Sequence, residues 1–560
     1  MPLGFVEPPP YVPQSHNDLS AEDAAYIDKV LVLPPDIAEL DRGVFHWDID
    51  DWEKMDAKSR IDNSGFDRVF EVAGMKWQLW IYPQGLSEKD FISFRVRSLT
   101  AREKPQDWQV CAYTLLVVAN QHDSASYTRS SCRCRISNSS PDTDYKTFLT
   151  RNELEKRQKC KDRPLLENNR FRIIFYVRIA DDPTGVLWHD YRGYNSLKQT
   201  GYIGLATLDT CRYLNPLLEV LLHIKPLRDA VSKVGRAEFD TQHMLALALS
   251  EIFTNILSGM PPISAIKVLN TLEALDIKPP ANTELDSFTG QILQNITSSL
   301  RTIVPESNID SLIGGKIRKT SQRLQTSKSS SSIFRHFRGP DMVVTESALN
   351  PINLNIMGFS NVKQSLRDFV SHRVVSRTNH QLFKSSKEND WTERIEIVEL
   401  PSVLFMCLKR FDQASASSSP TKLDTEFAYD ESLDMAEFAP EIGGSNVPTR
   451  YTLYGACVHH GAASQGYHFC ILRPTVDDKW FAFDDDIIIP LLRRHAFDDY
   501  KAVDYACSFG VAARQRKMYE AKRFSNAYML IYVRDSELKH ILGQDDNTTR
   551  SAQSGSMPKN

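Results

Sequence analysis

The sequence predicts a multidomain protein in which an antiparallel β-sandwich precedes an α+β domain. Between residues 43 and 180, short runs rich in β-branched and aromatic residues are separated by polar turns, with no helical pattern between them. This arrangement is typical of a sandwich. Further along, apolar residues first recur at three- and four-residue spacing, and strand-like runs return afterwards, which predicts helices followed by a sheet. The 560 residues are enough for about two to four domains.

Composition excludes several classes of protein. The net charge of −4 is too small for the electric field alone to attract nucleic acid or a membrane, and no apolar run approaches the ~20 residues of a membrane span. The nine cysteines include no CxxC pair, so we expect reduced thiols and a location in the cytoplasm, the nucleus or both. The first residues lack the basic start and apolar core of a secretory signal. We expect no metal site and no cofactor.

The N-terminal part divides into a tail, a sandwich and a linker. Residues 1–42 are rich in proline and polar residues, which predicts a disordered tail with at most a short helix. The sandwich is expected over residues 43–180, and a linker over 181–199. The predicted strands are VFHWDI, DRVFEVAGMKWQLWIYPQ, FISFRVRSL, WQVCAYTLLVVAN and FRIIFYVRIA.

The α+β domain is expected over residues 201–534. Helices are predicted in CRYLNPLLEVLLHIKPLRDAVSKV and TQHMLALALSEIFTNILSG. The serine- and lysine-rich segment 319–341 is interpreted as a mobile insertion. Residues 535–560 are expected to form a disordered tail. The later strands are predicted in IEIVELPSVLFMCLKRFD, YTLYGACVHH, HFCILRP, WFAFDDDIIIP and NAYMLIYV.

Cys211 stands at the predicted start of a helix, in the stretch TCRYLNPLLEVL. A helix dipole favours the thiolate form of a cysteine at its N-terminus. A thiol nucleophile also needs a histidine base and an acid that orients this base. His468 in QGYHFCIL and Asp484 in KWFAFDDD are the candidates, because both are predicted at the ends of neighbouring strands. On pattern alone, an ordinary turn histidine and solvated acids remain the alternative.

Several motifs, in order along the chain, resemble those of a known family. These are TGYIGL, LDSF at 285–288, LNIMGFSNVKQSLRDFV, LPSVLFMCLKRF, KWFAFDDD and SNAYMLIYVRDSEL. Residues 201–534 resemble the catalytic domain of ubiquitin-specific proteases, and residues 43–180 resemble the MATH (TRAF-like) domain that precedes it. The resemblance implies a papain-like fold with thumb, palm and fingers, the fingers lying near 315–360. It also implies hydrolysis of the isopeptide bond after the C-terminal glycine of ubiquitin, so that ubiquitin or a ubiquitin-like protein is the expected partner.

The nucleophile position departs from the family pattern. Aligned without gaps, the family's cysteine falls on Arg212, and Cys211 lies one place early. A guanidinium stays protonated and cannot attack a carbonyl. Pro216 suits a helix that starts afresh with Asn215 as its N-cap. The sequence therefore predicts that the nucleophile is missing and that the helix start has moved away from it.

Other positions are also altered. The oxyanion-hole asparagine of the family becomes Thr207, the acid that pairs with the arginines of the ubiquitin tail becomes Ile292, and Gln294 survives beside it. A glycine that the tail passes closely becomes Tyr467. The resemblance places the base at His468 and the acids at Asp484 and at Asp485, which are retained.

The resemblance also assigns a peptide-binding strand to the MATH domain. The corresponding segment begins with Asp142 and includes Thr143, Asp144 and Tyr145, followed by Phe148. Extended peptides bind such domains by strand addition. Because the family's aromatic anchor is replaced by Thr143, the family's preferred peptide is not expected to be the ligand. Asp142, Tyr145 and Phe148 are the predicted contacts for peptide segments of partner proteins.

Two functions follow from these observations. The first is a pseudo-deubiquitinase that binds ubiquitin or another protein partner without hydrolysing it. The alternative is an active cysteine-type deubiquitinase that cleaves ubiquitin or a ubiquitin-like modifier with Cys211.

Overall fold

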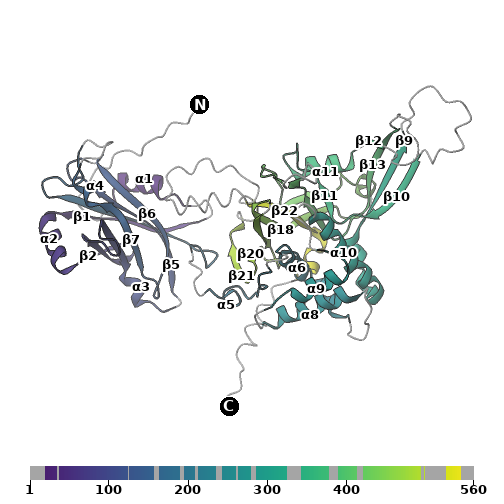
Figure 1. Ribbon diagram of the computed structural model, residues 1–560, viewed down its shortest axis with the longest axis horizontal. Helices are drawn as coiled ribbons and strands as arrows, with labels where there is room; N and C mark the ends of the chain where they lie inside the picture. The colour runs from purple at the N-terminus through teal and green to yellow at the C-terminus, as the bar shows by residue number, and fades with distance from the viewer. Residues whose placement is uncertain are drawn as a thin grey trace, which may run out of the picture. The chain divides into compact units, whose positions relative to one another are not determined.

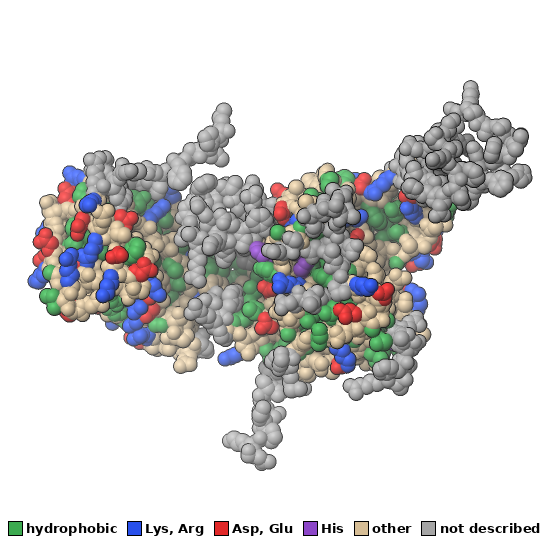
Figure 2. Space-filling view, viewed as in Figure 1, with side chains coloured by type: hydrophobic (Ala, Val, Ile, Leu, Met, Phe, Trp, Pro, Cys, Tyr) green, Lys and Arg blue, Asp and Glu red, His purple; other side chains and the backbone are tan. Residues whose placement is uncertain are grey.

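The structure is a computed structural model that forms two compact units, Met1–Tyr194 and Asn195–Asn560 (Figure 1). It describes residues 19–33, 37–106, 108–123, 125–156, 163–188, 194–208, 212–234, 243–259, 263–278, 285–323, 342–371, 373–377, 389–412, 421–444, 446–463, 465–493, 497 and 525–543. Figure 2 shows acidic and basic side chains interspersed over one face of both units, in keeping with the net charge of −4. No described helix is both long and apolar enough to cross a membrane.

The first unit is the predicted antiparallel sandwich. One sheet has the order β1 (Glu39–Ile49), β8 (Phe171–Ala180), β5 (Gln109–Ala119), β6 (Tyr127–Ser137), and the other has β2 (Phe66–Val72), β3 (Met75–Tyr82), β4 (Phe91–Ser98), β7 (Asp142–Thr150). Alternate residues of β3 are buried between the sheets, as the period of two requires. Trp77, Phe94 and Phe175 belong to this core. Short helices α2 (Trp52–Asp62), α3 (Leu99–Glu103) and α4 (Arg151–Glu155) join the strands.

One short helix, which the prediction allowed within residues 1–42, precedes the sandwich, and the described residues 19–33 and 37–42 are ordered. Helix α1 (Ala21–Val30) is capped by the Ser20 side chain and packs on the outer face of the β1–β8–β5–β6 sheet. Ile27 and Tyr26 belong to a cluster with apolar residues of β1, β5 and β8. The buried carboxylate of Asp23 accepts a hydrogen bond from the Tyr176 hydroxyl at 3.0 Å. The first unit therefore includes residues well before residue 43.

The second unit begins with helices on one face of a large sheet. They are α5 (Ser196–Thr200), α6 (Leu214–Leu222), α7 (Lys225–Ser232), α8 (Met244–Ser258), α9 (Ile266–Ala274) and α10 (Leu285–Ile303). The apolar stripe of α10 includes Phe288, Ile292 and Ile296, which are spaced by four residues and buried. This region corresponds to the thumb that the resemblance implies.

The palm is an eight-stranded sheet, most of whose strands pair antiparallel. Its order is β11 (Ile352–Leu354), β14 (Val403–Leu408), β22 (Ser525–Arg534), β18 (Arg450–Ala462), β19 (Gln465–Leu472), β20 (Trp480–Asp484), β21 (Ile487–Leu491), and β17 (Ser432–Asp434) pairs with β18. The thumb helices cover one face, and α11 (Val362–Val370) and α12 (Pro440–Gly443) cover the other. Because both faces are buried, β14 is apolar at every position.

The fingers form a separate sheet that projects from one end of this unit (Figure 1). Its order is β10 (Met342–Ala348), β9 (Lys316–Arg323), β13 (Asn389–Glu399), β12 (Arg373–Arg377). The fingers therefore extend beyond the expected range of 315–360, because β12 and β13 come later in the chain. Residues 319–323 of the predicted mobile insertion belong to β9, and its residues 324–341 lie outside the described part of the chain.

The chain also continues in order beyond residue 534, contrary to the prediction of a disordered tail over 535–560. A 3-10 turn (Asp535–Glu537) leads into α15 (Leu538–Leu542). Ile541 and Leu542 are buried in the thumb-side core. Residues 544–560 lie outside the described part.

Candidate functional site

A row of polar residues crosses one end of the palm sheet. His459 of β18 pairs in register with His468 of β19 and with Asn526 of β22. All three side chains are buried, with exposed fractions of 1%, 5% and 0%. They lie where β18 ends and where β19 and β22 begin, near the start of α6, which packs against β18, β19 and β20 (Figure 1). This end of the sheet holds the predicted base.

His468 is enclosed by aromatic rings. Its ring lies edge-on to Tyr213 at 6.0 Å and to Tyr528 at 5.2 Å between centroids. Burial, and then the positive charges of Lys422 and Arg212, together lower the pKa of His468 to about 3. The imidazole is therefore neutral near pH 7. Because a general base works best with a pKa near the working pH, His468 in this state is a weak base.

Neither predicted acid orients His468 in this structure. Among the described residues, the Nδ1 atom of His468 has no hydrogen-bond partner. Asp485 instead accepts a hydrogen bond from the Asn215 amide at 2.8 Å. Asp484 ends β20, and partial desolvation of its carboxyl group, and then the charges of Asp485 and Asp486, raise its pKa to about 6. The expected acid–base pair is thus not formed, and Asp485 instead fixes the start of α6 to the β20–β21 turn.

Close packing strengthens this junction. A Cβ atom on Gly204 would lie 2.0 Å from the backbone oxygen of Asp485, so only glycine lets the two segments approach this closely. Asp485 itself has a positive φ of 51°, which a β-turn aspartate tolerates. The loop that carries Gly204 and Thr207 therefore packs tightly against the turn that carries Asp485. Thr207 lies exposed in this loop.

Arg212 bridges the thumb and the palm. Its side chain is exposed, and its Nη1 donates a hydrogen bond to the Gly466 carbonyl of β19 at 3.0 Å. Gly466 comes two residues before His468. Cys211 lies outside the described residues, so no geometry is assigned to its thiol. The structure therefore brings Arg212 close to the predicted base.

Helix α6 starts at Leu214 with Tyr213 as its N-cap, which corrects the prediction that Asn215 is the N-cap. Asn215 lies inside the helix, and its amide also donates to the Ala206 carbonyl at 3.0 Å. Pro216 is the third helical residue, where its missing N–H would have had no partner within the helix. Proline therefore does not displace the helix start from Arg212.

Sequence reasoning missed His459, Asn526 and Lys422. Among the described residues, both ring nitrogens of His459 and both polar atoms of the Asn526 amide lack hydrogen-bond partners. The Lys422 amine donates to the carbonyls of His459 and Gly461 at 3.3 and 3.0 Å. Burial lowers the pKa of Lys422 to about 8. Polar residues at inward positions of otherwise apolar strands, in ACVHH and SNAYML, were the available signal.

A cavity of about 150 Å³ adjoins this polar row. Phe411 on its wall contacts the His459 ring at 5.1 Å, and Tyr528 contacts His468. Its lining residues are Leu285, Asp286, Cys407, Leu408, Lys409, Arg410, Phe411 and Tyr528. The cavity lies between the start of α10 and the end of β14.

Two predicted substrate-binding residues take unexpected positions. Ile292 is 2% exposed and belongs to the thumb-side core, so it faces away from any open groove; Gln294 on the same helix is exposed. Tyr467 is 40% exposed, and its ring lies tilted by 40° against that of His460, with 4.8 Å between the centroids. Because successive strand residues point to opposite faces, the Tyr467 ring lies on the other face from His468. The position of Ile292 is therefore not that of a tail contact, whereas the role of Tyr467 stays a prediction.

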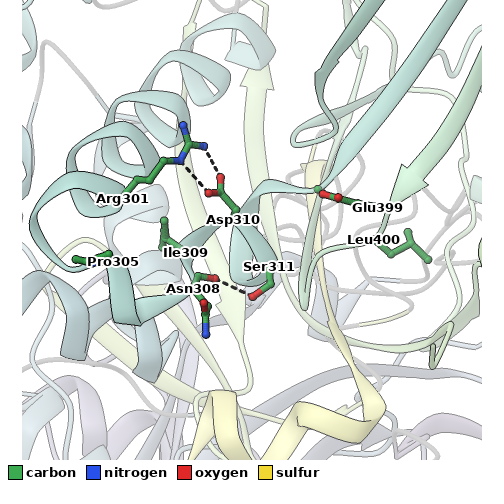
Figure 3. A pocket seen from close by; sticks show the side chains of 9 residues that line it. Arg301, Pro305, Asn308, Ile309, Asp310, Ser311, Glu399 and Leu400 are labelled. Atoms are coloured by element: carbon green, nitrogen blue, oxygen red, sulfur yellow. Dashed lines mark hydrogen bonds and ion pairs between the residues drawn. The ribbon is translucent and has the colours of Figure 1, made fainter. Parts of the chain in front are cut away.

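A larger cavity, of about 390 Å³, lies at the far end of α10. Arg301 is about 24 Å along the helix from Leu285 at ~1.5 Å per residue. Figure 3 shows the Arg301 guanidinium facing the Asp310 carboxylate, with an Nε–Oδ2 distance of 2.8 Å. Ser311 donates to the Asn308 carbonyl at 2.8 Å. Its charged side chains are paired within the protein, and it is separate from the polar row.

The predicted peptide-binding strand is an edge strand. β7 pairs with β4 alone in its described sheet, which leaves the other edge for strand addition. Asp142 and Asp144 are paired with Arg97 and Arg95, at Nε–Oδ1 distances of 2.5 and 2.7 Å. Tyr145, predicted as a contact residue, points into the core.

The Tyr145 hydroxyl lies 2.8 Å from the Thr114 hydroxyl in the sandwich interior. Phe148 is half-buried and packs on Phe94 at 4.9 Å. Tyr145 therefore stabilises the sandwich instead of touching a peptide. Across both units, the described residues include no group of three or more His, Cys, Asp or Glu side chains that could hold a metal ion.

Comparison with known proteins agrees with these two units. Residues 44–173 match the MATH domain, and residues 203–532 match the family described as ubiquitin carboxyl-terminal hydrolase. Ubiquitin carboxyl-terminal hydrolase 15 of Schizosaccharomyces pombe is 24% identical over 94% of this chain and 47% of its own length. Ubiquitin carboxyl-terminal hydrolase 7 of Drosophila melanogaster is 25% identical over 84% of this chain and 38% of its own length.

Ubiquitin C-terminal hydrolase 12 of Arabidopsis thaliana is 24% identical over 89% of this chain and 43% of its own length. The chain thus spans less than half the length of each of these relatives. The hydrolase match covers more than half of the chain itself. The chain belongs to the ubiquitin carboxyl-terminal hydrolase family and carries a MATH domain ahead of its hydrolase domain.

Proposed function

We propose that this chain binds ubiquitin through its hydrolase domain without hydrolysing it. The observation that carries the proposal is the position of Arg212. In the family pattern this residue stands where the nucleophilic cysteine belongs, and its guanidinium bonds to Gly466 beside the base. A guanidinium is permanently charged and is no nucleophile.

The state of His468 supports the same proposal. Its Nδ1 atom has no described partner, and its pKa is lowered to about 3. A thiol nucleophile is usually activated by an adjacent base that a third group orients. Asp485 is engaged with Asn215 instead. The retained histidine and acids are therefore assigned to packing and to the α6 junction.

The test is a cleavage assay with ubiquitin carrying a C-terminal fluorophore, run on the full chain alongside a binding measurement with free ubiquitin. We expect saturable binding and no turnover above the background of heat-denatured protein. Turnover that Cys211→Ala abolishes would refute the proposal, and loss of both binding and turnover would refute ubiquitin recognition.

An active thiol hydrolase is the second candidate, because Cys211 is adjacent in sequence to the nucleophile position. It predicts labelling of Cys211 by a ubiquitin probe that carries an electrophile at its C-terminus. A one-residue shift moves a residue by about 3.8 Å, and errors of about 1 Å already cost a hundredfold in rate. We therefore expect no labelling, with Cys407 as a buried control thiol.

We further propose that the free edge of β7 binds extended peptide segments of partner proteins, in the cytoplasm or nucleus. The Asp142–Arg97 and Asp144–Arg95 pairs lie on the outward side of β7 and would flank the peptide. A pull-down with the full chain, compared with a variant carrying proline at the exposed position Thr147, tests strand addition. Proline removes a backbone donor, so capture of the same partners by both proteins would refute this mode.

A further inference from the structure

The start of α6 combines several features that favour an anion. Helix α6 has nine residues, and its N-cap Tyr213 makes no side-chain capping bond. The first N–H groups of a helix carry a partial positive charge. Arg212 directly precedes them with an exposed side chain, and a guanidinium matches the two oxygens of a carboxylate.

A buried polar atom lies at the same place. His468 is 5% exposed, its Nδ1 has no partner among the described residues, and its ring contacts that of Tyr213. The charges that act on the His468 ring are both positive, those of Lys422 and Arg212. The nearby carboxylate of Asp485 is held by Asn215. An unpaired polar group this deeply buried usually indicates a missing water or ligand.

We propose that the α6 start, Arg212 and His468 form a receptor for a terminal carboxylate, namely the free C-terminus of unconjugated ubiquitin. The inference rests on the proposed function, which brings the ubiquitin tail to this end of the sheet. The Gly466 carbonyl holds the guanidinium between helix and strand, so the cation is positioned before the ligand arrives. An amide-linked tail carries no charge and would lose this interaction.

The consequence is selectivity for the state of the ubiquitin terminus. A catalytic cysteine at this position would act on tails joined to another group, whereas a cation there favours tails that have already been released. The protein would then sense or retain free ubiquitin. Because Arg212 is exposed, the ion pair is expected to contribute about fivefold in affinity at ordinary ionic strength.

The experiment compares two probes by calorimetry with the full chain: ubiquitin with its C-terminal carboxylate, and ubiquitin whose terminus is a primary amide. Wild type should bind the carboxylate form about fivefold more tightly. Arg212→Gln should remove the difference, and Arg212→Lys should keep part of it. Arg450→Gln is the matched control, because this exposed arginine begins β18 and lies about 30 Å along the strand from His459 at ~3.4 Å per residue.

Each outcome separates this inference from the proposed function. Equal binding of both probes to wild type would overturn the carboxylate receptor and leave ubiquitin binding intact. Tighter binding of either probe by Arg212→Gln would show that Arg212 blocks the site, which also overturns the inference. Failure of wild type to bind either probe would overturn both proposals.

Discussion

Replacing Ile292 with aspartate tests whether this side chain lies in the ubiquitin-tail groove, as the family pattern implies, or in the protein core, as the structure shows. The pattern would make Ile292→Asp a restored contact for the arginines of the ubiquitin tail. The structure buries this side chain, at 2% exposure, in the thumb core. Loss of a large buried aliphatic group costs about 2–5 kcal/mol. Keeping an aspartate neutral there at pH 7 means raising its pKa from ~3.9 to 7 or more, which adds about 4 kcal/mol.

Together these terms reach roughly 6 kcal/mol or more, which is comparable with the whole stability of a typical domain. Urea unfolding followed by far-UV circular dichroism measures the loss, which should be smaller at pH 5 because the buried acid is then protonated more easily. Gln294→Asp, exposed on the same helix, is the control and should change stability by no more than about 1 kcal/mol. A stable Ile292→Asp protein that binds ubiquitin more tightly would show that residue 292 faces the tail.

Three further substitutions test other parts of the structure. Gly204→Ala places a methyl group 2.0 Å from the Asp485 backbone oxygen and should lower the free energy of unfolding in urea by about 1–3 kcal/mol. Gly444→Ala, with no neighbour nearer than 3.9 Å, should be nearly neutral; equal effects would mean that the loop moves freely. Burial raises the pKa of Glu219 from 4.5 to about 8, so its contribution to stability falls as pH rises between these values. Glu219→Gln should flatten that slope and gain up to about 4 kcal/mol at pH 7.5; an unchanged pH profile would contradict a protonated Glu219. Tyr145→Phe loses the hydrogen bond to Thr114 and should lower the free energy of unfolding of the sandwich by about 1 kcal/mol without changing peptide capture. Weaker capture at equal stability would show that the Tyr145 hydroxyl contacts the peptide.

Sequence patterns predicted the two-part architecture because they report burial directly. Strands buried on both faces appear as unbroken apolar runs, as in β14, and strands buried on one face alternate, as in β3 of the sandwich. The same logic could have placed Ile292, since Phe288, Ile292 and Ile296 follow helical spacing. At this position the family resemblance and the helical periodicity disagree, and the buried side chain of Ile292 follows the periodicity.

Other features depend on contacts that no local pattern contains. Asn215 had the residue type of an N-cap, but its amide bonds to Asp485, 270 positions away. His468 could be located from its motif, yet its lack of an orienting acid follows from where the β20–β21 turn packs. A short helix was allowed within the proline-rich segment, and Ser20 and Asp23 carry an N-terminal capping signal, but its packing on the sandwich depends on distant residues.

Helix α1 covers apolar residues of β1, β5 and β8, and this sets the minimum length of a soluble N-terminal fragment. A fragment that begins at residue 43 would expose Val44, Leu115 and Ile174, which α1 otherwise shields. Contiguous apolar surface of this kind promotes self-association. Guanidinium groups beneath the helix, such as Arg178, which pairs with Asp28 at 3.2 Å, would lose their partners as well. A soluble, monomeric sandwich for partner screening should therefore start before Ser20, and the same peptide supplied in trans would restore solubility to the shorter fragment.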